Sequence, residues 1–235
     1  SNLESLDLSN NSLTGSIPTS LFHVPSLKNM QMAKNKFSGQ LNEFESMPSS
    51  RLATLDLSSN NLEGPVPKSI FQLRGLVSLY LGGNRFNGTL ELNEILSPLH
   101  DLKCLHLSDN FLSIDTRTNP IVRKSSFPQL WSLRLASCNL GILPEFLRNQ
   151  SELSDLDLSN NHIQGIVPKW IWTFSEGLFY LNLSCNSFVE LERPISSAPA
   201  LNIVDLHSNN FQGELPSQIL EGRQYLDFSS NKFTS

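Results

Sequence analysis

The sequence predicts an α/β solenoid, with a concave sheet of short parallel strands and short 3-10 or extended segments on the convex side. Three observations predict this fold. A nine-residue pattern recurs along the whole chain, apolar and polar residues alternate inside it, and Gly and Pro recur at fixed places after it. We expect a single domain over residues 1–235 that contains about ten repeats.

The repeated pattern is L-x-x-L-x-L-x-x-N, where x is any residue, and successive copies begin 22 to 28 residues apart. Ten copies begin at Leu3, Leu27, Leu52, Leu76, Leu102, Leu130, Leu153, Leu178, Leu201 and Arg223. The ninth position is Asn in nine copies and Cys138 in the sixth copy. Recurrence at a fixed period indicates stacked units, because each unit buries its apolar face only against its neighbours.

One short strand is predicted in every copy, where Leu at positions four and six alternates with polar residues. In the third copy Leu55 and Leu57 should point into the core, while Thr54, Asp56 and Ser58 should point outward. This follows because successive side chains of a strand lie on opposite faces. Such a short strand needs parallel neighbours, so the copies should pair side by side.

The Asn at the end of each copy should bond backbone groups in the turn after the strand, which would form a ladder of amides along the solenoid. Cys138 fits this ladder as a small buried residue. Two residues after the ladder position every copy has Leu, Ile or Phe, and five of these ten residues are Phe. We expect these side chains to stack between repeats as part of the core.

The return segments share a Gly followed three residues later by Pro, as in residues 13–18, 62–67, 163–168 and 211–216. Gly permits backbone angles that other residues avoid, and Pro fixes an extended entry. We therefore expect a short extended stretch followed by a turn of helix. The fifth copy is the longest, and its extra segment, 113–127, is interpreted as a surface loop that could also be functional.

Taken together, the repeat and its Gly-x-x-Pro return segment resemble the plant-specific class of leucine-rich repeats, which form a horseshoe or superhelix. Residues 135–140, 168–172, 206–209 and 227–235 resemble the receptor-like proteins of the Verticillium wilt resistance type. The resemblance implies an internal block of repeats, without either cap, from the extracellular region of a cell-surface protein.

The same resemblance implies a role in pathogen perception and defence signalling. It implies an extracellular protein, peptide or glycan ligand and a co-receptor kinase, with membrane contact only through a transmembrane helix outside this chain. The expected location is the extracellular side of the plasma membrane, or alternatively the cell wall after secretion. Two other functions stay open: the ectodomain of a leucine-rich-repeat receptor kinase, and a secreted protein that resembles polygalacturonase inhibitors.

The outward strand positions provide candidate binding residues. Asp is the commonest residue at position five, but copies four to six have Tyr80, His106 and Arg134 there. Neighbouring strands lie about 5 Å apart, and Tyr and Arg often dominate binding energy at interfaces. We hypothesise that these three residues, flanked by Asp157 and Tyr180, form part of a ligand or co-receptor surface. Neutral variation at solvent-exposed positions is the alternative.

Four Asn-x-Ser/Thr sequons are candidates for glycosylation, at Asn10, Asn87, Asn149 and Asn182. The first overlaps the repeat's own Asn-rich turn. Asn182 lies at an outward strand position, where we expect a glycan to be attached and to obstruct the surface around the eighth repeat.

Composition and motifs argue against other functions. The net charge is −5 without a basic block, which argues against nucleic-acid binding, and no apolar run is long enough to cross a membrane. No catalytic motif occurs, so we expect no enzymatic activity, cofactor or metal, and the Asp column is interpreted as a solvated acidic strip. Cys104 and His106 share one strand face but lack the further groups that a nucleophile or a zinc site needs. Disulfides are not expected, because the three cysteines are too far apart or at different positions of the repeat.

Overall fold

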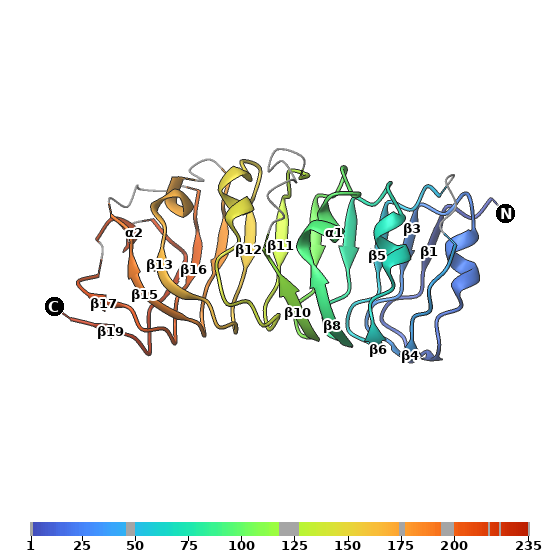
Figure 1. The fold of residues 1–235 in the computed structure, drawn as a ribbon, viewed down its shortest axis with the longest axis horizontal. Coiled ribbons are helices and arrows are strands. Elements are labelled where there is room, and N and C mark those ends of the chain that lie inside the picture. Colours follow the sequence, from blue (N-terminus) through green and yellow to red (C-terminus); the bar gives the residue numbers. More distant parts are fainter. Residues whose placement is uncertain are drawn as a thin grey trace. The chain divides into compact units, whose positions relative to one another are not determined.

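The computed structural model describes residues 2–45, 50–117, 127–173, 177–193, 200–215, 217–220 and 222–234. The chain forms two compact units, Ser1–Gln129 and Leu130–Ser235, and both consist of the same repeat (Figure 1). The organisation as one domain without caps stays a prediction. Residues 118–126 of the long fifth repeat, which include Arg123 and Lys124, lie outside the described residues.

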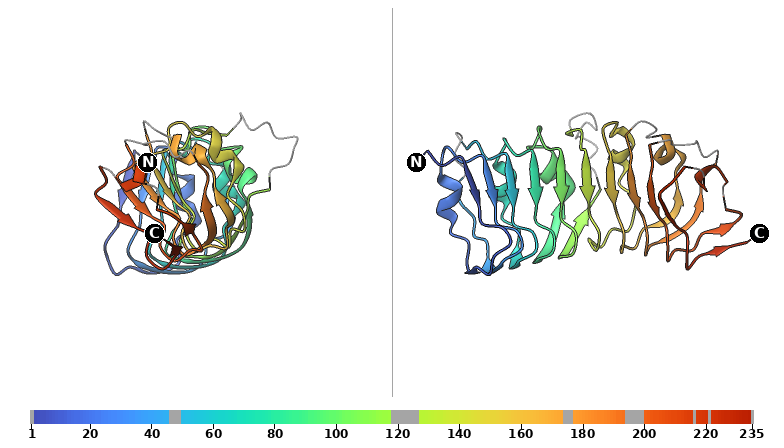
Figure 2. Two further views of the ribbon diagram at one scale, coloured as in Figure 1. Left: turned by 90° about the vertical axis from the view of Figure 1, so that its left-hand side faces the viewer. Right: turned by 180° about the vertical axis from the view of Figure 1, so that it is seen from behind.

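The main sheet of unit one is parallel and has one strand from each repeat. Its order is β1 (Ser5–Asp7), β3 (Asn29–Gln31), β5 (Thr54–Asp56), β7 (Ser78–Tyr80) and β9 (Cys104–His106). Ser5 pairs with Asn29 and Thr54 pairs with Ser78, so equal positions of the repeat lie side by side. Figure 2 shows the strands of this sheet as a row of neighbouring arrows, coloured from blue to green. A strand is confirmed in each of these copies, but it covers positions three to five only, so Leu57 and Ser58 follow β5.

A second parallel sheet of unit one follows the ladder residues. Its strands are β10 (Phe111–Asp115), β8 (Arg85–Glu91), β6 (Asn61–Pro65), β4 (Lys36–Gln40) and β2 (Thr14–Gly15), in that order. Helical turns return the chain to the next strand at η1 (Thr19–His23), η2 (Lys68–Gln72) and α1 (Leu92–Leu96). The sequence predicted an extended stretch and a helical turn, but it did not predict that the extended stretches pair.

The Gly and Pro of the return segments act as expected. Gly15 and Gly64 have φ of 87° and 78°, which places both in the left-handed region that favours glycine. Pro18 and Pro67 precede η1 and η2 with extended backbone angles (φ −73°, ψ 128° and φ −66°, ψ 133°). Proline therefore sets the direction in which the chain enters each helical turn.

Unit two repeats the same plan. Its main parallel sheet has the order β11 (Ser132–Arg134), β12 (Asp155–Asp157), β14 (Tyr180–Asn182), β16 (Ile203–Asp205) and β18 (Tyr225–Asp227). The return segments form two parallel pairs: β13 (Gln164–Val167) with β15 (Ser187–Leu191), and β17 (Gln212–Gly213) with β19 (Lys232–Phe233). The helical segments are η4 (Glu145–Asn149), η5 (Lys169–Thr173) and α2 (Ser217–Leu220).

The ladder of amides is present as predicted. Asn60 Nδ2 donates to the carbonyls of Leu57 (3.1 Å) and Ser58 (3.2 Å), and to Met32 (3.0 Å) of the preceding repeat. Its Oδ1 accepts the backbone N–H of Phe37 at 3.1 Å, also from the preceding repeat. The same side-chain bonds recur at Asn84, Asn186 and Asn209. Each amide thus satisfies buried backbone groups of two repeats.

The core consists of the leucines at positions four and six together with the residue that follows the ladder. Leu55 and Leu57 are fully buried, which confirms their predicted direction. In unit two the rings of Phe188, Phe211 and Phe233 are stacked, with centroids 6.1 Å and 5.9 Å apart and interplanar angles of 4° and 14°. The expected aromatic stack is confirmed for these three rings.

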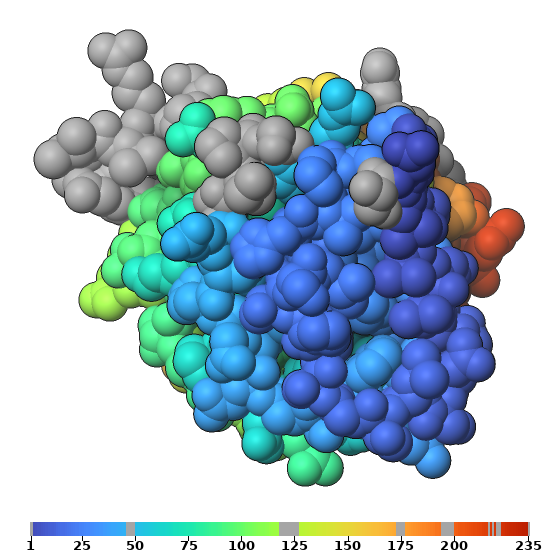
Figure 3. Space-filling view, turned by 90° about the vertical axis from the view of Figure 1, so that its right-hand side faces the viewer, coloured from blue at the N-terminus to red at the C-terminus, as the bar shows by residue number. Residues whose placement is uncertain are grey.

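Burial of a repeat depends on both of its neighbours. Leu3 and Leu13 in the first repeat are 40% and 38% exposed, whereas the equivalent Leu52 and Leu62 in the third repeat are 3% and 1% exposed. Figure 3 shows the face of unit one to which the first repeat contributes. A copy that packs on one side only therefore leaves a third or more of these side chains in contact with water.

Candidate functional site

Tyr80 and His106 occupy equal positions on the adjacent strands β7 and β9 of unit one. Their rings meet edge to face, with centroids 4.7 Å apart and an interplanar angle of 76°. Burial raises the pKa of the Tyr80 hydroxyl, and the neighbouring Cys104 side chain raises it further. These two predicted binding residues therefore form one half-buried aromatic pair.

Cys104, the nearest candidate for a nucleophile, lies on the same outward face as His106 but is 6% exposed. Its side chain neighbours Tyr80, and the main-chain N–H of Cys104 donates to the carbonyl of Val77 at 3.1 Å. The Cys104 thiol is therefore buried beside the Tyr80 phenol. All three cysteines of the chain, including Cys138 and Cys185, are free thiols.

Arg134 is the centre of a second group, on strands β11, β12 and β14 of unit two. Its Nη2 lies 2.7 Å from Asp155 Oδ2, and its Nε donates to both carboxylate oxygens at 3.1 and 3.2 Å. The guanidinium carbon lies 5.5 Å from the centre of the Tyr180 ring, within the range of a cation–π contact. The hydrogen bond to Asp155 raises the pKa of Arg134, so this side chain stays charged.

Asp157 adds a second carboxylate to this group. It is half-buried on β12, and burial raises its pKa even though Ser159 donates to its Oδ1 from both N–H (3.0 Å) and Oγ (2.7 Å). Arg134 and Tyr180 both interact electrostatically with Asp157. We call Arg134, Asp155, Asp157 and Tyr180 the arginine cluster. It combines a fixed positive charge, two carboxylates and an aromatic ring on one face of the sheet.

Two exposed aromatic side chains lie at the amino ends of the same strands. Trp131 directly precedes β11 and is 58% exposed, and Phe179 directly precedes β14 and is 45% exposed. The Trp131 carbonyl accepts the backbone N–H of Asp155 at 3.1 Å, so this edge adjoins the arginine cluster. Exposed aromatic rings beside a charged cluster form a surface with both apolar and polar contacts to offer.

The five predicted binding residues therefore form two groups, one in each unit. The structure brings Tyr80 together with His106, and Arg134 together with Tyr180 and Asp157. Sequence reasoning missed Asp155, the ionic partner of Arg134, and the exposed Trp131 and Phe179. Asp155 lies at position three of the next repeat, so only a comparison of diagonal neighbours on adjacent strands would have found it. Ligand binding by the five residues stays a prediction.

The candidate glycosylation sites differ in exposure. Asn182 is half-buried, its Nδ2 donates to the Tyr180 hydroxyl at 3.3 Å, and its Oδ1 accepts the N–H and Oγ of Ser184. The other three sites are exposed: Asn10, Asn87 and Asn149. Glycans attach at Nδ2, so occupancy of Asn182 would replace its bond to Tyr180. All four sites stay predictions.

The Asp column has a structural role in the turn after each strand. Oδ1 of Asp7, Asp56 and Asp227 accepts the backbone N–H of the Ser two residues later at 2.9 to 3.0 Å. The next residue has positive φ in the repeats, for example Ser59 (54°) and Ser230 (56°). In the ninth repeat the Ser is replaced by His207, whose Nδ1 lies 2.6 Å from Asp205 Oδ1. Sequence reasoning did not single out this substitution.

None of the helices in the described part of the chain is both long and apolar enough to cross a lipid bilayer.

The comparisons with known proteins identify the class. The family described as Leucine Rich Repeat matches residues 2–24, 51–73 and 152–174. With the parallel sheets and the Asn ladder, this match makes the chain a leucine-rich-repeat region. Its fold is similar to that of the Arabidopsis receptor kinase HAESA, solved with the peptide hormone IDA and the co-receptor SERK1. That similarity has a TM-score of 0.78 at 27% identity and covers 100% of this chain and 38% of HAESA.

Among sequences, the similarity is to plant receptor-like proteins. Receptor-like protein 49 of Arabidopsis thaliana is 43% identical over 236 residues, which is 99% of this chain and 27% of that protein. Receptor-like protein 35 of the same plant is 38% identical over 153 residues, which is 61% of this chain and 16% of that protein. The chain thus spans between a sixth and about a quarter of these relatives. The predicted resemblance to leucine-rich-repeat receptor-like proteins is confirmed.

Proposed function

We propose that this chain is an extracellular recognition region of a plant receptor-like protein that acts in pathogen perception and defence signalling. The full-length protein binds a protein, peptide or glycan outside the cell and signals through a co-receptor kinase. It is anchored at the plasma membrane, and this chain itself catalyses no reaction. The proposal is supported by 43% identity to Receptor-like protein 49 over 99% of the chain.

The arginine cluster, with the adjoining Trp131 and Phe179, is the observation that carries the proposal. Arg, Tyr and Trp are the residue types that most often dominate binding energy at protein interfaces. Arg134 is 42% exposed and is held in place by Asp155 and the Tyr180 ring, so little side-chain entropy is lost when a ligand binds. Its remaining N–H groups can bind a carboxylate or a carbonyl of the ligand.

The solved complex of HAESA contains a peptide hormone and a co-receptor. We extend both kinds of partner to this chain, since the two share the repeat architecture over the whole chain. A peptide along the outward face of β11, β12 and β14 would contact charged and aromatic side chains in turn. This surface therefore fits an extended peptide that offers apolar groups to the rings and a carbonyl oxygen to Arg134.

A response assay in leaves tests the proposal. The full-length receptor is expressed with a tag, the leaves are treated with microbial culture extracts, and the oxidative burst is recorded. We expect Arg134→Ala with Tyr180→Ala to raise the required extract concentration by about tenfold or more, as expected for loss of two hot-spot residues. Arg148→Ala, which removes an exposed Arg from η4 in the same unit, is the matched control.

Two further readouts accompany the oxidative burst. Surface labelling should detect the tagged receptor outside the cell, and co-immunoprecipitation should recover a receptor kinase after treatment. An unchanged response in the double variant, at equal surface abundance, would contradict the role of the arginine cluster. A receptor that surface labelling does not detect would contradict the proposed location.

The ectodomain of a receptor kinase is the second candidate function, because HAESA, which this chain resembles in structure, is a receptor kinase. The higher identity to Receptor-like protein 49 favours the first candidate. Sequencing the complete transcript distinguishes the two, since only a receptor kinase has kinase motifs after its transmembrane segment.

A further inference from the structure

Two departures from the repeat meet at one place in unit two. Position seven of the repeat is Ser, Ala or Gly in nine copies and His207 in the ninth copy. Position eight, where the backbone has positive φ, is Cys185 in the eighth copy, with φ of 53°. Left-handed backbone is usually occupied by Gly, Asn or Asp, so a Cys there is uncommon. Two residue types that bind metals thus replace the usual turn residues on adjacent repeats.

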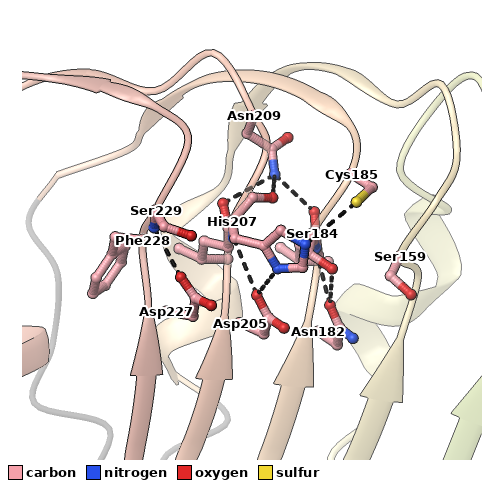
Figure 4. A network of polar contacts seen from close by, with 12 residues as sticks. Ser159, Asn182, Ser184, Cys185, Asp205, His207, Asn209, Asp227, Phe228 and Ser229 are labelled. Carbon is pink, nitrogen blue, oxygen red and sulfur yellow. Dashed lines mark hydrogen bonds and ion pairs between the residues drawn. The ribbon is translucent and has the colours of Figure 1, made fainter.

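These side chains converge with two carboxylates (Figure 4). His207 Nδ1 lies 2.6 Å from Asp205 Oδ1, and His207 Nε2 lies 3.5 Å from Cys185 Sγ. Asp227 reaches the same place from the neighbouring strand β18, where it pairs in register with Asp205. One donor atom each from Asp205, His207 and Asp227 lie within 4.8 Å of one another. We call Cys185, Asp205, His207 and Asp227 the histidine cluster.

A simpler interpretation treats His207 as a substitute for the Ser of other repeats. Ser58 and Ser159 donate through Oγ to the preceding Asp at 2.6 and 2.7 Å, and His207 Nδ1 makes the equivalent contact with Asp205. This interpretation explains the contact with Asp205, and the stacking of neighbouring repeats brings Cys185 and Asp227 beside the same imidazole. It gives the three neighbouring side chains no common role.

The two carboxylates lie on adjacent strands, where Asp205 pairs in register with Asp227. Repeats nine and ten are the only neighbouring copies in the sequence with Asp at both fifth positions. Asp227 Oδ1 accepts the backbone N–H of Ser229 at 2.9 Å, and its Oδ2 accepts the Tyr225 hydroxyl at 3.2 Å. Like charges directly opposite on paired strands repel each other. A positive ion between Asp205 and Asp227 would reverse this repulsion.

We propose that Asp205, His207 and Asp227 bind one divalent transition-metal ion such as Zn²⁺, and that Cys185 orients the imidazole through Nε2. Two carboxylates and an imidazole form a donor set that suits zinc better than magnesium or calcium, which prefer oxygen ligands alone. Nδ1 binds the ion, so the proton resides on Nε2 and is directed at the Cys185 sulfur. Metal-bound histidines are usually held through their second nitrogen in this way.

The geometry permits this coordination after small movements. Donor atoms around a tetrahedral zinc ion lie about 3.4 Å apart. His207 Nδ1 and Asp205 Oδ1, which are 2.6 Å apart, must therefore separate slightly, while Asp227 moves toward them. His207 and Asp205 are 33% and 17% exposed, which leaves room for rotation and for a water ligand. The ion would join the turn after β16 to the strand β18.

Calorimetric titration of the purified chain with zinc chloride alone tests the proposal. We expect one Zn²⁺ per chain and a higher thermal unfolding temperature, since an ion that binds only the folded state stabilises it. His207→Ser should weaken the affinity by about tenfold or more, and this variant should fold because Ser occupies the position in six other repeats. His162→Ser, which removes an exposed histidine from the same unit, should leave the affinity unchanged.

Cobalt absorption and one further variant test the arrangement of the site. With Co²⁺ we expect visible bands without a thiolate charge-transfer band, and Cys185→Ser should reduce affinity by less than His207→Ser does. A strong thiolate band would overturn the role given to Cys185. Equal Zn²⁺ affinity in His207→Ser, several weak ions per chain, or equal stabilisation by Mg²⁺ would overturn the site itself.

Discussion

Replacing one ladder amide, Asn186→Ala, should destabilise unit two by an amount that the structure allows us to estimate. Asn186 Nδ2 donates to the carbonyls of Leu158 (2.9 Å), Leu183 (3.2 Å) and Ser184 (3.1 Å). Its Oδ1 accepts the backbone N–H of Ile163 at 3.0 Å, and the side chain lies in a residue that is only 8% exposed. The substitution removes all four bonds at once.

The four backbone groups that bond Asn186 differ in how many hydrogen bonds they keep after the substitution. The carbonyls of Leu158 and Leu183 keep the bonds from Nδ2 of Asn161 and Asn209, both at 3.0 Å. The Ser184 carbonyl keeps a backbone N–H at 2.9 Å. Only the Ile163 N–H loses its acceptor, and a buried unsatisfied N–H costs about 1–3 kcal/mol. With the weaker losses at the carbonyls, we expect the free energy of unfolding to fall by about 2–4 kcal/mol.

Urea unfolding followed by tryptophan fluorescence measures this loss, because Trp172 is fully buried in the same unit. Asn210→Ala is the matched control: this Asn lies next to a ladder position but is half-buried, and surface changes of this kind stay within about 0.5 kcal/mol. If Asn186→Ala costs no more than Asn210→Ala, the ladder is not an energetic element of the fold and the reasoning is wrong.

Three further predictions concern packing, charge and pH. Phe211→Ala removes the fully buried middle ring of the stack and should cost about 3–5 kcal/mol in urea unfolding; a loss below 1 kcal/mol would contradict the packing argument. Arg134→Ala breaks a partly exposed ion pair and should cost less than about 1 kcal/mol, so a larger loss would mean that Arg134 is structural. Asp157 has a raised pKa, which means that its protonated form favours folding at low pH and that this contribution is lost as pH rises through the raised pKa. Asp157→Asn should therefore be at least as stable as the parent at pH 7, with a smaller advantage at acid pH; a clear loss at pH 7 would refute the sign.

The sequence pattern was sufficient for the parts of the fold that depend on one repeat and its equivalents. Strand positions, the inward direction of Leu55 and Leu57, and the ladder at Asn60 all follow from alternation and recurrence. The pairing of the return segments did not follow, because these stretches vary from two to seven residues and several contain Gly or Pro, which are depleted in strands.

The candidate sites depend on contacts that a repeat pattern does not describe. Arg134 bonds diagonally, from position five of one repeat to position three of the next, so a comparison of equal positions does not reveal Asp155. His207 and Cys185 occupy different positions of neighbouring copies and meet only because the turns stack. A comparison of all ten copies, position by position, would have found His207 and Cys185, because each differs there from every other copy.

The main sheets also bear on how such a chain can change. Repeats that differ in length from 22 to 28 residues still pair with equal positions in register within each unit, as Tyr180 does with Ile203 and Ser5 with Asn29. Differences in length are confined to the return side, where β13 and β15 shift register at Gly165. Deleting or duplicating a whole repeat would therefore preserve every strand pairing on either side of the change. Unequal recombination between copies can therefore change the order of the outward residues, and with it the ligand specificity, while the fold is preserved.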